Sequence, residues 1–164
     1  MTRKSRNWKK TTTPLAKRAL KDLGEFQYHS GMQVFISHSS KDTLAARQLA
    51  QRLSEAGLRV WIPEDEILPG DNWAKKVGEA LEKSDLMVVL VTPHAFESEW
   101  LKEEIQYALT AEHYKGRLIP VFLGPAGEIP SNLPWILRKM NPVQINGSED
   151  DWQLVVDKVS TLAL

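Results

Sequence analysis

The chain has 164 residues, of which 42% are apolar and 26% charged, and its formal net charge is zero. This size and composition predict one globular domain with a single core. The absence of cysteine excludes disulfides, thiolate zinc sites and cysteine nucleophiles. No apolar run approaches the roughly 18 residues of a membrane-spanning helix, and the N-terminus lacks the apolar segment of a signal peptide, so we expect a cytoplasmic protein without membrane contact.

The N-terminal region is strongly basic. Residues 1–24 hold eight Lys/Arg and one acid, a net charge of +7, which leaves −7 for the rest of the neutral chain. A proline in the first turn and a closing Gly24 predict a short helix over Leu15–Leu23. We divide the chain into a basic arm, residues 1–31, and a folded domain, residues 32–164. The arm is either a solvated tail or a docking segment for a partner or an acidic polymer.

Strands and helices alternate after Gly31. Short runs of β-branched, aromatic and aliphatic residues predict the strands, and apolar residues at helical spacing predict the helices. Leu44, Leu49 and Leu53 are expected on one helix face, and Leu101, Ile105, Ala108 and Leu109 on another. The predicted strands are Gln33–Ser37, Leu58–Ile62, Leu86–Thr92, Leu118–Leu123 and Val143–Ile145; the predicted helices are Lys41–Ala56, Asp71–Lys83, Ser98 or Glu99 to Tyr114, a weak one at Leu133–Lys139, and Glu149–Leu162.

This alternation predicts an α/β fold with right-handed parallel crossovers. The expected architecture is a flavodoxin-like open five-stranded parallel sheet, order 2-1-3-4-5, with helices on both faces. Ligands of such sheets bind at the carboxyl ends of the strands. The segments delivered there are His38–Lys41, Pro63–Gly70 and Pro93–Trp100.

Several nucleotide motifs of this architecture are missing. Neither a Gly-rich dinucleotide fingerprint nor a P-loop occurs, and Thr92-Pro93 stands where a phosphoacceptor receiver domain needs an aspartate. The turn Ser37–Asp42 enters a helix N-terminus, where backbone N–H groups can hold a phosphate. Alternatively, Ser39 or Ser40 only caps that helix.

Carboxylates and tryptophans provide further candidates. Trp100 and Glu104 are four residues apart and project from one side of a helix, at the edge of its apolar stripe. Adjacent Glu103 and Glu104 are equally typical of a solvated acidic face, and Trp73 and Trp100 of ordinary packing. The four histidines form no metal-ligand spacing and accompany no nucleophile elbow, so we expect neither a metal site nor a Ser-His-Asp triad.

These segments together resemble the TIR (Toll/interleukin-1 receptor) family. VFISHSSKD (Val34–Asp42) resembles its first-strand motif, and VWIPEDEILPGDNW (Val60–Trp73) its second strand and BB loop. SDLMVVLVTPHAFESEW (Ser84–Trp100) resembles the third strand and the Ser-x-Trp motif, after which Glu104 matches the family's catalytic glutamate. Leu101 replaces a cysteine that is frequent in the family. The resemblance covers about residues 32–162.

The resemblance implies an NAD+ nucleosidase that cleaves the nicotinamide–ribosyl bond, with NAD+ as substrate and no cofactor. Some family members produce cyclic ADP-ribose isomers. A cationic leaving group needs no strong general acid, so one carboxylate that stabilises an oxocarbenium-like ribose suffices. Glu104 takes that role. The expected substrate-binding residues are Trp100 on the nicotinamide side, Trp73 on a base, Ser39, Ser40 and Lys41 at the phosphates, and His38 of the same loop, whose specific role is open. The expected assembly residues of the BB loop are Pro63, Glu64, Asp65, Leu68, Pro69 and Gly70.

The activity is expected to depend on assembly. The resemblance implies a defence effector, as in anti-phage immunity, that other TIR units and a separate sensor or activator switch on, with the basic arm as the contact for that protein. We do not expect direct nucleic-acid binding. The alternatives are a non-catalytic TIR interaction module and, outside the family, a flavodoxin-like or receiver-like signalling domain.

Overall fold

The computed structural model describes residues 31–125 and 128–163, and the helix predicted at Leu15–Leu23 lies outside this part. Five parallel strands form one sheet in the order β2-β1-β3-β4-β5, as predicted. They are β1 (Gln33–Ser37), β2 (Arg59–Trp61), β3 (Leu86–Val91), β4 (Leu118–Leu123) and β5 (Val143–Ile145). Among the described helices, none combines the length and apolar composition of a membrane span.

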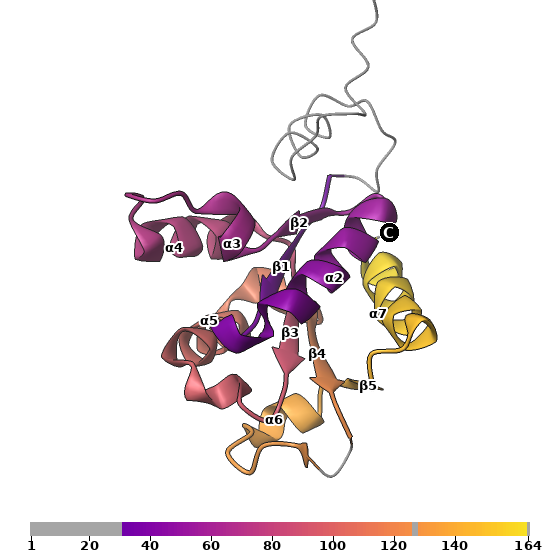
Figure 1. Ribbon diagram of the computed structural model, residues 1–164. Coiled ribbons are helices and arrows are strands. Elements are labelled where there is room, and N and C mark those ends of the chain that lie inside the picture. The colour runs from indigo at the N-terminus through magenta and orange to yellow at the C-terminus, as the bar shows by residue number, and fades with distance from the viewer. Residues whose placement is uncertain (1–30, 126–127, 164) are drawn as a thin grey trace, which may run out of the picture.

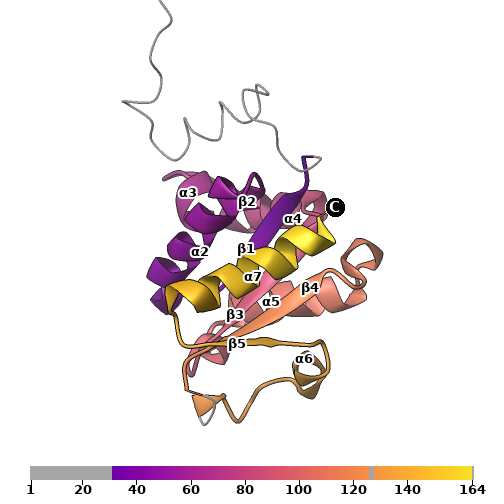
Figure 2. The same cartoon turned by 90° about the vertical axis from the view of Figure 1, so that its right-hand side faces the viewer.

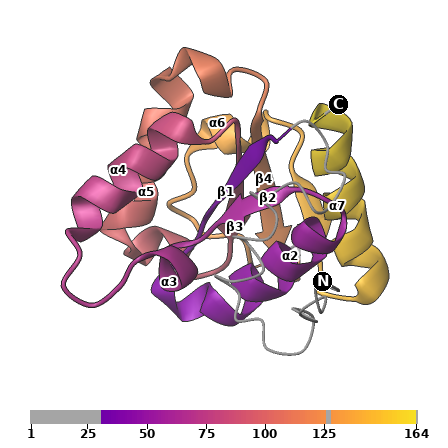
Figure 3. The same cartoon turned by 90° about the horizontal axis from the view of Figure 1, so that it is seen from above.

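Helices cover both faces of the sheet (Figure 1). Figure 2 shows α7 crossing one face beside α2, and Figure 3 shows α4 and α5 on the opposite face. The α-helices are α2 (Thr43–Glu55), α3 (Pro63–Glu66), α4 (Trp73–Lys83), α5 (Glu99–Thr110), α6 (Trp135–Arg138) and α7 (Glu149–Leu162), and 3₁₀ turns occupy Ser40–Asp42, Ala95–Glu97 and Glu112–Tyr114.

The side chains of the central strands alternate between two apolar layers. Val34 and Ile36 of β1 pack in the layer beneath α2 and α7, whereas Phe35 packs in the layer beneath α4 and α5. The same alternation runs along β3, whose six residues are all buried, as expected for a strand covered on both faces. This two-residue period directs Ser37, at the end of β1, toward α5.

The structure adds one short helix to the prediction and shortens four others, most of all the helix predicted to end at Tyr114. The segment Pro63–Gly70 is not entirely a loop, because its first four residues form α3, with a proline in the first turn and acidic residues at the positive end of the helix. The helix predicted to reach Tyr114 ends at Thr110, since Ala111 is extended. This break turns Tyr114 into the core, where its hydroxyl donates to the Leu81 carbonyl oxygen at 2.7 Å.

Two leucines assigned to helix core faces lie on the surface. Leu44 is 73% exposed because the buried stripe of α2 is Ala46, Leu49 and Leu53, and Leu44 points about 200° away from Ala46 around the helix. Leu109 of α5 is 40% exposed. The fourth buried residue of α5, beside Leu101, Ile105 and Ala108, is instead Glu104.

Candidate active site

Glu104 lies inside the buried stripe of α5. The stripe consists of Leu101, Glu104, Ile105 and Ala108, at the i, i+3, i+4, i+7 spacing of a helix face that packs against a sheet. Only 6% of Glu104 is exposed, whereas its neighbour Glu103 is on the surface. Helix α5 starts at this point of the chain because the Ser98 hydroxyl accepts a hydrogen bond from the Leu101 amide at 3.2 Å.

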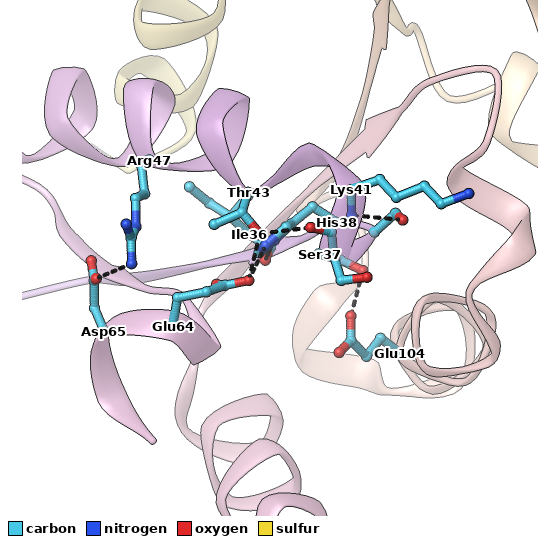
Figure 4. Close-up of polar contacts among 11 residues, drawn as sticks. Ile36, Ser37, His38, Lys41, Thr43, Arg47, Glu64, Asp65 and Glu104 are labelled. Carbon is cyan, nitrogen blue, oxygen red and sulfur yellow. Dashed lines mark hydrogen bonds and ion pairs between the residues drawn. The ribbon is translucent and has the colours of Figure 1, made fainter. Parts of the chain in front are cut away.

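The carboxylate of Glu104 meets the end of the first strand. Ser37 Oγ donates a hydrogen bond to Glu104 Oε2 at 2.5 Å, and Figure 4 shows the two side chains pointing toward each other. Ser37 itself is completely buried. Strand alternation and the helix stripe, two independent periodicities, therefore bring the acid to the carboxyl edge of β1, close to the turn Ser37–Asp42.

The surroundings of Glu104 favour its neutral form. Burial raises the pKa of Glu104 to about 7, and the charge of Glu64 acts in the same direction. The hydrogen bond from Ser37 and the positive charge of His38 oppose this shift. The group therefore titrates near neutral pH, which is unusual for a glutamate and typical of functional carboxylates.

His38 lies beside this acid and connects it to α3. Its side chain is 2% exposed, and Nε2 lies 2.8 Å from Glu64 Oε1. Thr43 Oγ1 lies 3.0 Å from the same oxygen and 2.9 Å from the Ser40 carbonyl oxygen, so the single hydroxyl proton serves both acceptors. Burial alone would lower the pKa of His38, but the hydrogen bond and charge of Glu64 raise it.

A second polar cluster joins the loops that follow β1 and β3. The buried carboxylate of Asp42 accepts a hydrogen bond from Thr92 Oγ1 at 2.6 Å and contacts His94 Nε2 at 2.9 Å. Asp42 therefore does not cap α2, although it precedes it. Asp42 was not predicted as a site residue, and only the position of its loop at the strand ends pointed to it.

The serines and the lysine of the same turn have different surroundings. Ser39 is buried, and its Oγ accepts a hydrogen bond from the Lys41 amide at 3.3 Å, so Ser39 does cap the turn that leads into α2. Ser40 is on the surface. The Lys41 ammonium group is exposed and pairs with Glu97 at 2.9 Å.

The two candidate tryptophans are partly exposed. Trp100 in the first turn of α5 is 44% exposed, and Trp73 at the start of α4 is 41% exposed. Between α3 and α4, Leu68, Pro69 and Gly70 lie on the surface, with Leu68 58% exposed. Gly70 has a φ of +91°, a left-handed conformation that favours glycine. Pro63 is buried, and Glu64 and Asp65 are partly buried, with Asp65 3.6 Å from Arg47.

The described residues contain no group of three or more His, Asp or Glu side chains placed to bind a metal ion. The acid-centred site at the edge of β1 therefore rests on Glu104, Ser37, His38 and Glu64.

Residues 34–158 match the family model of the TIR domain. This chain belongs to the TIR domain family. The match covers both polar clusters and all five strands apart from Gln33, the first residue of β1, so the recognition made from the motifs is confirmed. The basic arm, residues 1–31, lies outside it.

Of two curated relatives of this TIR chain, one is named as an enzyme and the other as an adapter. The "NAD(+) hydrolase TcpA" of Theionarchaea archaeon (strain DG-70-1) is 35% identical over 94 residues, which are 56% of this chain and 28% of that protein. The human "Toll/interleukin-1 receptor domain-containing adapter protein" is 31% identical over 106 residues, 63% of this chain and 48% of the adapter. The aligned TIR segments thus span about a quarter to a half of these relatives.

A solved structure supports the same fold. The TIR domain of the Toll-related receptor TRR-2 from Hydra magnipapillata superimposes with a TM-score of 0.61 at 20% identity, covering 83% of this chain and 97% of that one. At this identity, the likeness concerns the fold alone. Function must be argued from the residues of the site.

Proposed function

We propose that this TIR domain is an NAD+ nucleosidase that cleaves the bond between nicotinamide and ribose, with Glu104 as its catalytic residue. The observation that carries the proposal is the burial of Glu104 at the carboxyl edge of β1, in a helix stripe where an apolar residue would stabilise the fold. A buried carboxylate costs stability, so its presence calls for a function. The similarity to the archaeal NAD+ hydrolase supports the same reaction.

The reaction needs one well-placed negative charge. The C1′–N bond breaks, its electron pair leaves with the pyridinium nitrogen, and nicotinamide departs neutral from an oxocarbenium-like ribose. Water then attacks C1′ and releases a proton, giving ADP-ribose; attack by a group of the same molecule instead gives a cyclic isomer. An ionised Glu104 stabilises the positive ribose and accepts hydrogen bonds from its hydroxyls. Among the described residues Ser37 alone is hydrogen-bonded to this carboxylate, through Oε2, so Oε1 remains for the sugar.

Five further residues, from the turn after β1 and the first turns of α4 and α5, are assigned to the rest of the dinucleotide. Trp100 packs on the nicotinamide side and Trp73 stacks on a base, both with a large exposed ring surface. Ser39, Ser40 and Lys41 bind the phosphates. An exposed ion pair such as Lys41 with Glu97 is weak and exchanges readily for a phosphate contact.

Activation by assembly is part of the proposal. Leu68 projects from the segment Pro63–Gly70 with 58% of its surface exposed, which supports packing of this segment against another TIR unit. A separate sensor or activator protein binds through the basic arm, and the setting is immune defence in the cytoplasm, including defence against phage. NAD+ is the substrate, and no further cofactor is required.

The test measures the release of nicotinamide from NAD+ by chromatography. The protein is concentrated during the reaction with crowding agents or on beads. Glu104→Ala is expected to reduce turnover by at least about a hundredfold. The matched control is Glu103→Ala, because it removes the same side chain from the neighbouring exposed position of the same helix. Equal turnover by both variants and the wild type would refute the role of Glu104.

A second candidate function is a non-catalytic TIR interaction module. The similarity to the human adapter protein and the exposed Leu68 favour it. An adapter needs no buried carboxylate, so this function leaves the cost of Glu104 unexplained. Wild-type protein that forms assemblies but releases no nicotinamide would support the module and reject the enzyme.

A further inference from the structure

Both ring nitrogens of His38 face hydrogen-bond acceptors. Nδ1 lies 3.2 Å from the Ile36 carbonyl oxygen, which can only accept, so Nδ1 must carry a proton. Nε2 lies 2.8 Å from a Glu64 oxygen. Burial alone would raise the pKa of Glu64, but the hydrogen bond and charge of His38 lower it, which favours an ionised Glu64 that accepts a hydrogen bond from Nε2. With both ring nitrogens as donors, the ring is doubly protonated and positively charged.

This cation is enclosed by the protein. The His38 side chain is 2% exposed and the Glu64 side chain 22% exposed, so the pair is shielded from solvent and salt much more than a surface ion pair. One of its neighbours is Glu104, whose charge also favours the protonated ring. The charged groups that face His38 are therefore Glu64 from α3 and Glu104 from α5, with the Ile36 carbonyl oxygen as the polar neighbour from β1.

We propose that His38 is a positioning residue of this site, a buried imidazolium that Glu64 holds beside Glu104 and that favours the ionised form of the Glu104 carboxylate against the effect of burial. The role is indirect, because both polar atoms of the ring are already bound within the protein and cannot contact a substrate without breaking these bonds. For its kinetic consequences the inference rests on the proposed NAD+ cleavage.

The arrangement links the Pro63–Gly70 segment to the reacting carboxylate. Glu64 is in α3, whereas Glu104 is in α5, and His38 contacts one and acts electrostatically on the other (Figure 4). If α3 moves away, His38 loses the partner that offsets its burial and releases its proton. Glu104 then loses a nearby positive charge and takes up a proton. A displacement of α3 is in this way converted into a change of charge at the site.

The first test is independent of activity. His38 is identified by NMR as the imidazole signal that His38→Gln removes, and its titration is compared between wild type and Glu64→Gln. We expect Glu64→Gln to lower the pKa of His38 by about one unit or more, because burial is then less opposed. An unchanged titration of His38 in Glu64→Gln would overturn the proposal.

The second test observes Glu104 directly through its side-chain carboxyl carbon. His38→Gln is expected to raise the pKa of Glu104 by about one unit, which is a tenfold fall in the ionised-to-neutral ratio at any given pH. His94→Gln is the matched control, because His94 makes a comparable contact, 2.9 Å to Asp42, and is not among the groups that act on Glu104. An unchanged or lowered pKa of Glu104 in His38→Gln would overturn the proposal.

The third test uses the pH profile of nicotinamide release. His38→Gln is expected to move the acid limb of kcat/KM, which reports the free enzyme, to higher pH by the same interval as the Glu104 titration, with KM at alkaline pH unchanged. A rise in KM at every pH without displacement of the acid limb would show direct substrate contact and refute the positioning role. An inactive wild type would refute NAD+ cleavage, while the two NMR titrations would still decide the role of His38.

Discussion

Replacing Glu104 by glutamine should stabilise the protein at neutral and alkaline pH. The folded protein holds the pKa of this acid at about 7, above its ordinary value of 4.5, mainly because the group is buried. Below pH 4.5 the acid is protonated in both states and does not change the unfolding free energy. As pH rises from 4.5 through 7, the unfolded chain loses the proton more readily than the folded protein, so the unfolding free energy falls. Glutamine has nearly the same shape and never ionises, so Glu104→Gln lacks this loss.

The size of the effect follows from the displacement of the pKa. The pKa of Glu104 rises from 4.5 in the unfolded chain to about 7 in the folded protein, and each unit corresponds to about 1.36 kcal/mol. The unfolding free energy of the wild type is therefore lower by about 3 kcal/mol at about pH 8. At about pH 5 the loss is below about 1 kcal/mol, so the advantage of Glu104→Gln should grow by about 2 to 3 kcal/mol between these two values. For a domain of this size, the gain at the higher pH raises the Tm by about 10 °C.

The measurement is urea unfolding of wild type and Glu104→Gln across this pH range, with the Tm as a second readout. The pH dependence of the difference is decisive, because any fixed cost of burying the amide cancels from it. Glu103→Gln is the control, since the same change at the exposed neighbour should give a difference that is flat with pH. A flat difference for Glu104→Gln as well would mean that this acid is not held near neutral pH by burial. The variant should at the same time lose NAD+ cleavage.

Three further changes address the neighbours of this acid and the surface. Ser37→Ala removes the hydrogen bond that favours ionised Glu104, so its pKa should rise further; the acid limb of nicotinamide release should move to higher pH, and an unmoved limb would contradict this. Thr92→Val removes the donor to the buried Asp42 carboxylate and should lower the unfolding free energy by about 1 to 3 kcal/mol in urea titrations, where no change would show that the contact is dispensable. Leu68→Glu should change stability by less than about 0.5 kcal/mol because the side chain is exposed, but should abolish self-association in light scattering; assembly as strong as that of the wild type would exclude this surface.

The sheet was predictable because its strands carry a strong local signal. The apolar run Leu86–Val91, preceded by Ser84-Asp85 and followed by Thr92-Pro93, predicts a buried strand, and alternation with helices predicts parallel neighbours. Gln33–Ser37, Val143–Ile145 and the helix Glu149–Leu162 were predicted with the bounds that the structure has. These elements depend on residues close together in the chain.

The burial of Glu104 was not predicted from the residues themselves, since adjacent glutamates usually lie in solvent. The available signal was its spacing, because Glu104 completes the helix face of Leu101, Ile105 and Ala108 better than the exposed Leu109 does. Burial of a charge is decided by how α5 seats on the sheet, which no local pattern specifies.

The contact between His38 and Glu64 joins residues that are 26 positions apart, and the contact between Thr92 and Asp42 joins residues 50 apart. The topology predicted that their loops meet at one edge of the sheet, but not which side chains pair. Such pairings depend on loop conformation and on the first turn of α3, and this turn was expected to be a loop.

The strand position of Ser37 has a consequence for how this domain can fail. Ile36 and Ser37 point to opposite layers, and β1 is hydrogen-bonded to β2 on one side and β3 on the other. Insertion of one residue within β1 would exchange the two layers beyond that point, placing the side chain of Ile36 against Glu104 and the hydroxyl of Ser37 among the apolar residues beneath α2 and α7. The hydrogen bonds that align the three strands therefore determine the contact between Ser37 and Glu104 as well as the fold. A change of strand register could leave the protein folded but inactive.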